Sequence, residues 1–182
     1  MVSQEMSTEE REVLQTLDAL IRNESIAAMI DPIVLQVEKK LAQSPDALMA
    51  WEPIPVSVYG KDLPAMIRSS WVFILRAQVT TGAERHPNSH QRMVSYREQG
   101  NFQVWSEGRW RSHFLMSDLE ADLESRWVSI PPNVWHQAAD PAQDWVVVSF
   151  HTALADELIE ERPDTNDLQS TQQRTYLEGP DQ

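Results

Sequence analysis

The sequence predicts a mainly-β domain of the sandwich or barrel class, preceded by α-helices. From residue 54 onward, short runs rich in β-branched and aromatic residues alternate with turn signals, which is typical of such domains. Before residue 54, apolar residues recur at helical spacing instead. At 182 residues, of which 41% are hydrophobic, the chain is long enough for one domain with a buried core.

Two helices are expected at the N-terminus. Residues 7–22 have a capping-box pattern at Ser7 and Glu10, and their apolar side chains fall on one face. A second helix is expected from Asp31, which can cap it, with Pro32 at the first helical position. Because these helices cannot bury their apolar faces alone, we expect them to pack outside the β domain or across a dimer interface.

Strands are predicted at 70–76, 90–96, 102–105, 109–116, 126–130 and 145–150. The chain becomes acidic and polar beyond residue 155, which indicates a flexible tail. The expected organisation is therefore a helical extension over 1–53, a β barrel over 54–155 and an acidic C-terminal tail over 156–182.

Composition limits the partners. The net charge of −13 disfavours phosphate backbones, so no nucleic-acid partner is expected. No apolar run approaches the roughly 20 residues of a membrane span, and no secretion signal is visible, so a cytoplasmic location without membrane contact is expected. The absence of cysteine excludes disulfides and thiolate metal sites.

Two segments place imidazoles where a strand meets a turn, residues 82–90 and residues 131–136. If 86–90 is extended, the side chains of His86, Asn88 and His90 share a face, because alternate residues of a strand point the same way. Arg92 and Tyr96 would continue this row toward the barrel interior, and His136 would approach from a neighbouring strand. Three imidazoles can hold Fe(II), Mn(II), Ni(II) or Zn(II) and leave positions open for water, dioxygen or substrate.

The same segments resemble the two motifs of the cupin superfamily, whose fold is a jelly-roll barrel or double-stranded β-helix. Its second motif reads roughly G-x5-P-x-G-x2-H-x3-N. Pro131 and His136 match it, and Asn133 replaces the central glycine, which is a tolerated exchange because Asn also adopts the left-handed backbone conformation. Ser125 stands for the first glycine and Asp140 for the final asparagine.

The first cupin motif reads roughly G-x5-H-x-H-x3-4-E-x6-G. Gly82 and His90 fall in place, Asn88 stands at the first histidine, and Val94 or Ser95 occupies the glutamate position. The glutamate ligand is therefore missing from this alignment. The resemblance covers about residues 54–155.

The resemblance implies a homodimer and a metal-dependent enzyme, dioxygenase-like, that acts on a small anionic molecule in the barrel cavity. The three-histidine variant of the family, which includes thiol dioxygenases, implies Fe(II) held by His86, His90 and His136, with Arg92 orienting a substrate carboxylate. Further candidates for substrate contact are Tyr96, Asn88, Gln103 and Trp135.

Two alternatives stay open at this point. A non-catalytic module that binds a small molecule is favoured by the missing glutamate and the lost terminal asparagine. A metal-independent sugar-nucleotide isomerase would need a histidine base facing a tyrosine acid, for which His90 and Tyr96 are candidates. A thymidine-sugar nucleotide as ligand would identify the isomerase, whereas a small acid or thiol would identify the oxygenase.

Overall fold

The computed structural model describes residues 6–163 and 171–175. Two α-helices and two 3-10 helices accompany ten strands in this part of the chain. The helical elements are α1 (Thr8–Ile21), α2 (Glu24–Gln43), η1 (Val56–Asp62) and η2 (Leu123–Ser125). The strands are β1 (Met49–Pro53), β2 (Ser69–Leu75), β3 (Gln91–Arg97), β4 (Gln99–Ser106), β5 (Arg109–Met116), β6 (Trp127–Ile130), β7 (His136–Ala139), β8 (Trp145–His151), β9 (Ile159–Pro163) and β10 (Thr171–Thr175).

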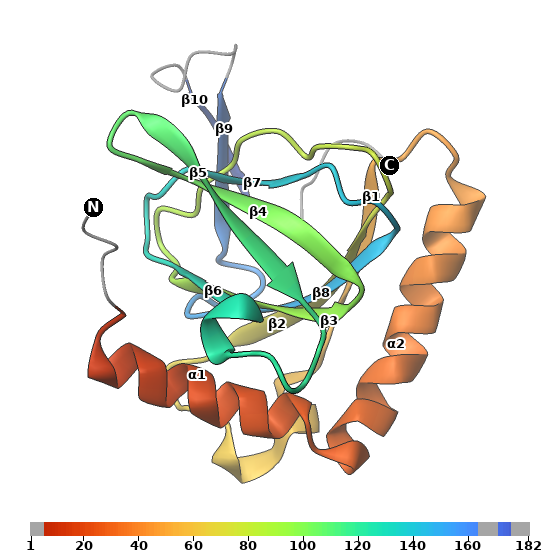
Figure 1. The fold of residues 1–182 in the computed structure, drawn as a ribbon, viewed down its shortest axis with the longest axis vertical. Helices are drawn as coiled ribbons and strands as arrows, with labels where there is room; N and C mark the ends of the chain where they lie inside the picture. Colours follow the sequence, from red (N-terminus) through yellow and green to blue (C-terminus); the bar gives the residue numbers. More distant parts are fainter. Residues whose placement is uncertain (1–5, 164–170, 176–182) are drawn as a thin grey trace.

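Two antiparallel sheets face each other (Figure 1). The larger sheet has the order β1-β2-β8-β3-β6, and the smaller has the order β5-β4-β7. Bridges at Thr80–Ala139 and Glu84–His136 pair the segment before β3 with β7, and a bridge at Arg85–Glu161 continues to β9. This crossing of strands between two sheets is a jelly roll, so the predicted mainly-β class with N-terminal helices is confirmed.

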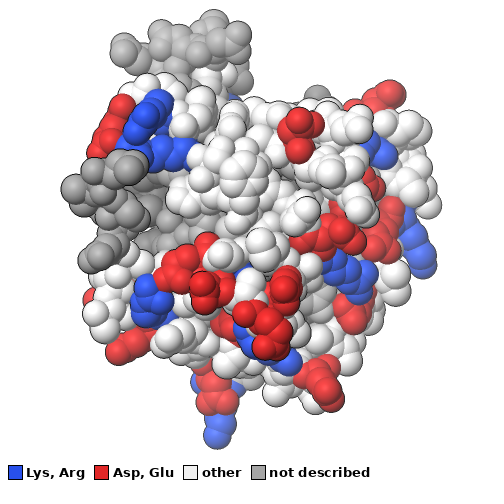
Figure 2. Space-filling view, viewed as in Figure 1, with Lys and Arg blue, Asp and Glu red and all other residues white. Residues whose placement is uncertain are grey.

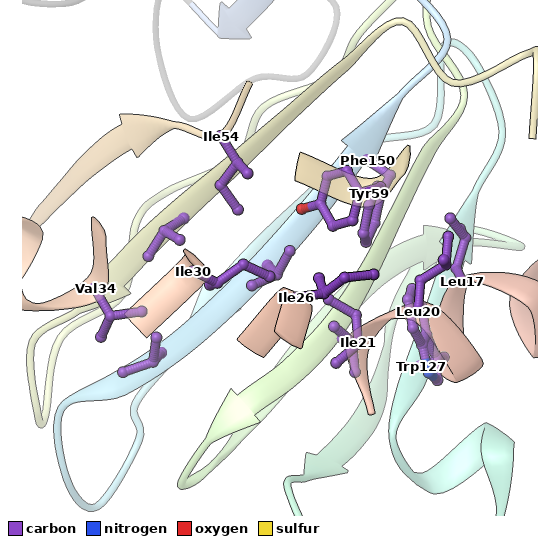
Figure 3. Packing of buried hydrophobic residues seen from close by; sticks show 14 of the residues in the cluster. Leu17, Leu20, Ile21, Ile26, Ile30, Val34, Ile54, Tyr59, Trp127 and Phe150 are labelled. Atoms are coloured by element: carbon purple, nitrogen blue, oxygen red, sulfur yellow. The ribbon is translucent and has the colours of Figure 1, made fainter. Parts of the chain in front are cut away.

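Two hydrophobic clusters lie on opposite faces of the larger sheet. The inner core lies between the sheets and is formed by Phe73, Leu75, Met93, Phe102, Leu115, Val128, Ile130, Ala138, Trp145 and Val147. The outer core lies between the larger sheet and the two helices. Figure 3 shows it, with Leu17, Ile21 and Ile30 of the helices in one cluster with Phe150 and Trp127 of the sheet. The helices therefore cover the outside of the jelly roll, one of the two placements that were expected.

The helix boundaries agree with the sequence at α1 and differ at α2. At α1, the Glu10 amide donates to Ser7 Oγ at 3.1 Å, as expected of an N-cap. The predicted start of the second helix at Asp31 is wrong. Asn23 caps α2 instead, because its side-chain oxygen accepts hydrogen bonds from the next residues' amides, and the helix runs through Pro32.

The predicted flexible tail over 156–182 is wrong for its first part. Residues 159–163 form β9, and backbone hydrogen bonds between Arg85 and Glu161, 2.9 and 3.0 Å long, attach this strand to the smaller sheet. Residues 164–170 and 176–182 lie outside the described residues. Inclusion of β9 adds a strand next to the segment that carries Glu84 and His86.

The outer face of the smaller sheet is uncovered by helices and poor in charge. It corresponds to the mostly white upper middle of Figure 2, where Figure 1 has β4 and β5. Trp105 and Trp110 are paired there edge to face, and Phe114 is 70% exposed. Among the described residues, no helix is both long and apolar enough to cross a membrane.

Candidate metal centre

The direction of alternation along β3 decides which predicted residues can meet. Met93 belongs to the inner core, and its neighbour Val94 belongs to the outer core. Up to Ser95, even-numbered residues of β3 therefore point toward the helices and odd-numbered residues point between the sheets. A register shift after Ser95 ends this alternation, and Arg97 pairs with Asp31 of α2. The expectation that Arg92 and Tyr96 point into the barrel is therefore wrong. A shift of one residue in the alternation of a strand moves its side chains to the opposite face of the sheet.

His90 also lies on the helix side and is not brought together with His86 and His136. Its Nε2 lies 2.7 Å from Ser129 Oγ, which donates to Glu10 of α1 at 2.6 Å. Arg92 donates to the same carboxylate through Nε and Nη2, at 2.7 and 2.6 Å. These four residues form a partly buried polar cluster, the α1 anchor, that attaches α1 to the sheet.

Tyr96 and the remaining predicted contact residues have structural partners. The Tyr96 hydroxyl donates to Asp31 of α2 at 2.9 Å, so it does not face His90 across a cavity as an isomerase acid would. The Asn88 side chain donates to the Glu157 carbonyl and accepts from the Ile159 amide.

Gln103 and Trp135 also lie away from the imidazoles. The Gln103 side chain accepts a hydrogen bond from Gln137 at 2.6 Å. Gln137 follows His136 directly in β7, so this pair lies on the opposite face of the smaller sheet from His136. The Arg85 guanidinium lies over the Trp135 ring, 4.6 Å from its centroid. Substrate contact by Gln103 or Trp135 stays a prediction without a contact to support it.

Three donors do converge between the sheets: Glu84, His86 and His136. One ligand atom from each lies within 4.8 Å of the other two. His136 Nε2 is 3.5 Å from Glu84 Oε1. Both histidines are buried, whereas the Glu84 side chain is 18% exposed. The bridge between the Glu84 segment and β7 explains the convergence, because paired residues of an antiparallel ladder point to the same face.

Backbone carbonyls fix the orientation of both imidazoles. His86 Nδ1 donates to the Ile159 carbonyl at 2.9 Å, and His136 Nδ1 donates to the Val134 carbonyl at 2.9 Å. Since a carbonyl can only accept, Nδ1 of each ring carries a proton, and Nε2 is the nitrogen left to bind a metal when it is deprotonated. Metal-binding histidines in proteins are held in the same way.

The spacing and chemistry of these donors fit a divalent metal. Ligand atoms 2.0–2.2 Å from one ion lie about 3–3.5 Å apart, so small side-chain rotations are enough to close the set around it. His136 Nε2 is buried and lies 3.5 Å from Glu84 Oε1, so a metal ion bound by both atoms would satisfy both. Two imidazoles and one carboxylate are the donor set of many non-haem Fe(II) sites.

The electrostatics keep Glu84 and His86 in the protonation states that bind metals. Burial, aided by the neighbouring His136, lowers the pKa of His86 to about 4, so that the ring is neutral at pH 7. Burial alone would raise the pKa of Glu84, but the nearby His136 and the Arg162 guanidinium outweigh it and hold that pKa well below its usual range. Glu84 is therefore a carboxylate.

Two further buried side chains border the three donors. The His151 ring lies edge-on to His86 with centroids 5.2 Å apart, and burial lowers its pKa well below the ordinary value. Gln91 pairs with His151 across β3 and β8, and its Oε1 is buried without a hydrogen bond. His151 therefore adds a further neutral imidazole beside His86.

The sequence alignment missed Glu84 and Gln91 because it was shifted along the first motif. With Gln78 and Glu98 at its two glycine positions, the spacing G-x5-H-x-H-x4-E-x6-G falls on Glu84, His86 and Gln91. Gln78 and Glu98 have positive φ, 61° and 64°, as the motif's glycines would. The only sequence signal for this part of the site was therefore the pair of possible ligands at Glu84 and His86, separated by one residue.

The second motif is where the sequence placed it. Asn133 has a φ of 66°, which is the left-handed conformation expected at the central glycine position, and His136 follows at the start of β7. Asp140, at the terminal asparagine position, also has positive φ, 42°. The turn at Pro131 and Asn133 thus delivers His136 to the ladder opposite Glu84.

Comparison with solved structures gives fold neighbours of low sequence identity. The capsular polysaccharide assembling protein CapF from Staphylococcus aureus matches with a TM-score of 0.47 and 14% identity, over 62% of this chain and 30% of that one. Oxalate oxidase in complex with the substrate analogue glycolate matches with a TM-score of 0.46 and 11% identity, over 60% of this chain and 53% of that one. Pumpkin seed globulin matches with a TM-score of 0.43 and 19% identity, over 52% of this chain and 23% of that one.

This chain thus spans between about a quarter and a half of the length of those proteins. No family model and no curated protein matches the chain. The fold and the three donors together define a jelly-roll protein with a candidate site for a divalent metal.

Proposed function

We propose that this protein is a metal-dependent enzyme of the oxygenase type, with a divalent metal held by Glu84, His86 and His136. The observation that carries the proposal is the clustering of the donors. One ligand atom of each residue lies within 4.8 Å of the other two, and the carbonyls that bind both Nδ1 atoms leave Nε2 of each ring for a metal.

Fe(II) is the metal that we favour, since two imidazoles and a carboxylate leave neighbouring positions open for a substrate and dioxygen. Bound there, Fe(II) supplies the one-electron chemistry that a reaction with dioxygen requires. The protein contributes two buried imidazoles, of which that of His86 is neutral at pH 7, and an ionised carboxylate. Mn(II), Ni(II) and Zn(II) are alternatives for the same donors.

The proposed substrate is a small anion. With a divalent ion, the neutral rings of His86 and His136 and the carboxylate of Glu84, the centre has a net charge of +1, which favours an anionic ligand in an open position. Arg92, the predicted anion contact, is already paired with Glu10 and drops out of this role. Homodimer formation stays a prediction from the family resemblance.

Metal content of purified protein tests the proposal. Wild-type protein is loaded with Fe(II) without oxygen, desalted and measured by elemental mass spectrometry beside His86→Ala and His136→Ala. We expect close to one equivalent in the wild type and a loss of at least about 10-fold in both variants, because each substitution removes a ligand. Equal metal content in wild type and His136→Ala would refute the metal centre.

His90→Ala is the matched control. It removes an imidazole only four residues from His86 but on the other face of the sheet. We expect it to keep the metal, whereas the alignment that makes His90 a ligand predicts loss. Oxygen consumption by the loaded wild type, screened over small carboxylic acids and thiols, then distinguishes an enzyme from a metal-containing binding module, which would bind without turnover.

A further inference from the structure

Strand β9 supplies contacts to two of the three proposed ligands. Its Ile159 carbonyl accepts the Nδ1 hydrogen bond of His86 at 2.9 Å. Its Arg162 donates through Nη2 to Glu84 Oε2 at 2.5 Å. The third ligand, His136, is held within its own turn by Val134. The strand that follows the predicted barrel therefore restricts the orientation of two of the three donors.

Arg162 is itself held at three points. Nη2 contacts Glu84, Nη1 donates to the Thr81 carbonyl at 3.1 Å, and Nε donates to Glu160 Oε1 at 2.7 Å. Glu160 is buried, with 3% of its surface exposed. A planar guanidinium with three fixed partners has little freedom to move, so it also restricts the carboxylate that it contacts.

The charge of Glu160 makes this arrangement compatible with a bound metal. A lone guanidinium beside a divalent ion would repel it, and the repulsion would be strong in a buried site. Glu160 offsets the charge of Arg162, so the pair is neutral as a unit. Arg162 can then orient Glu84 at little electrostatic cost to the ion.

We propose that Arg162 is a positioning residue of the metal centre, which holds Glu84 Oε2 so that Oε1 is presented to the ion as a single-oxygen ligand. This inference rests on the proposed function. It makes β9 a component of the centre rather than an appendage to the barrel. Glu84 Oε1 is already the oxygen that lies 3.5 Å from His136 Nε2.

The opposing explanation is that the contact between Arg162 and Glu84 only attaches β9 to the smaller sheet. The chain provides a matched control for this. Glu161, the residue before Arg162, forms an ion pair with Arg85 through Nε and Oε2, 2.6 Å apart. This pair also joins β9 to the segment around Glu84, but neither residue is a proposed ligand. Glu161→Gln weakens the attachment and leaves the Arg162 contacts in place.

The experiment is a titration of the full-length protein with Co(II), whose visible absorption reports the number and type of ligands. Wild type, Arg162→Met, Arg162→Lys and Glu161→Gln are compared by absorption and by calorimetry, and their folding is checked by circular dichroism. We expect Arg162→Met to weaken Co(II) binding by about 10–100-fold and to alter the spectrum, because Glu84 is no longer fixed. Glu161→Gln should stay within about threefold of wild type with an unchanged spectrum.

Arg162→Lys separates charge from geometry. A lysine is a single point charge and cannot contact both Glu84 and Glu160 in the way a guanidinium does, so we expect intermediate affinity. If Arg162→Met does not fold, this variant takes its place in the comparison. The inference is overturned if the Arg162 variants bind Co(II) like wild type, or if Glu161→Gln weakens binding as much as they do. Wild type that binds no Co(II) would instead overturn the proposed function.

Discussion

Substitution of Glu10 by alanine tests how α1 is attached to the jelly roll. The Glu10 carboxylate accepts two hydrogen bonds from Arg92 and one from Ser129. Arg92 is 3% exposed and Glu10 16%, so removal of the carboxylate leaves a buried guanidinium without its counter-ion. Loss of one partner from a buried pair costs about 3–5 kcal/mol.

We expect the free energy of unfolding of Glu10→Ala to fall by about 3 kcal/mol, the lower end of that range, because Glu10 is partly exposed. With a denaturant slope of about 2 kcal/mol/M, the urea midpoint should fall by roughly 1.5 M. Glu9→Ala is the control, since Glu9 is the exposed neighbour in the same helical turn. It should cost no more than about 0.5 kcal/mol, through the helix dipole.

The pH dependence of this difference provides a second measurement. Burial opposes ionisation of Glu10, but hydrogen bonds from Arg92 and Ser129 outweigh it and lower the pKa of Glu10 below its ordinary 4.5. A carboxylate with a lowered pKa stabilises the fold above pH 4.5, and this contribution is lost as the pH falls through the folded-state pKa. The gap between wild type and Glu10→Ala should therefore narrow below pH 4.5. A Glu10→Ala cost under about 1 kcal/mol at pH 7 would refute the reasoning.

Three more predictions concern packing, backbone conformation and alkaline pH. Gly100→Ala should lower the free energy of unfolding by about 3 kcal/mol, measured by urea denaturation, because its Cβ would overlap the Trp145 indole. Asn133→Gly should change the free energy of unfolding by less than about 0.5 kcal/mol. Asn133→Val should lower it by about 1–3 kcal/mol, because a β-branched residue is strained at a φ of 66°. Equal melting temperatures for these two variants would contradict this reasoning. Burial raises the pKa of Tyr59 far above its ordinary 10.0, so the unfolded state loses the proton first and stability should fall as the pH rises above 10. Phenolate absorbance of Tyr59 should then appear only with unfolding, and its appearance in folded protein would disprove the assignment.

The elements that were predicted correctly are those with local signals. The Ser7 cap, the β-branched and aromatic strands and the turn at Asn133 each depend on neighbouring residues, and the structure has all of them. The wrong prediction for the start of α2 also came from a local signal. Asp31 and Pro32 are good starting residues, but the tertiary packing of the outer core continues the helix through them.

The candidate site was predicted only in part because strand phase depends on both faces of the sheet. In β3 both faces are buried, one by the inner core and one by the helices, so the sequence lacks the alternation that identifies an inward face. The spacing of the sequence was enough to select His86 and His136 as candidate ligands. His90 and Arg92 could be excluded from the site only from the structure, in which they lie on the side of the sheet that α1 covers. Arg162 lies 78 residues from Glu84 in the chain, so no local pattern connects them.

The position of β8 in the larger sheet sets the order in which this protein can fold during synthesis. This strand lies between β2 and β3, yet Trp145–His151 leave the ribosome after every other strand of that sheet. Until then, the β1-β2 pair and the β3-β6 pair have no shared neighbour, and the outer core lacks Val146, Val148 and Phe150. Long-range pairing of this kind slows folding and leaves apolar surface exposed meanwhile. The nascent chain should therefore be a client for chaperones until residue 151 has emerged.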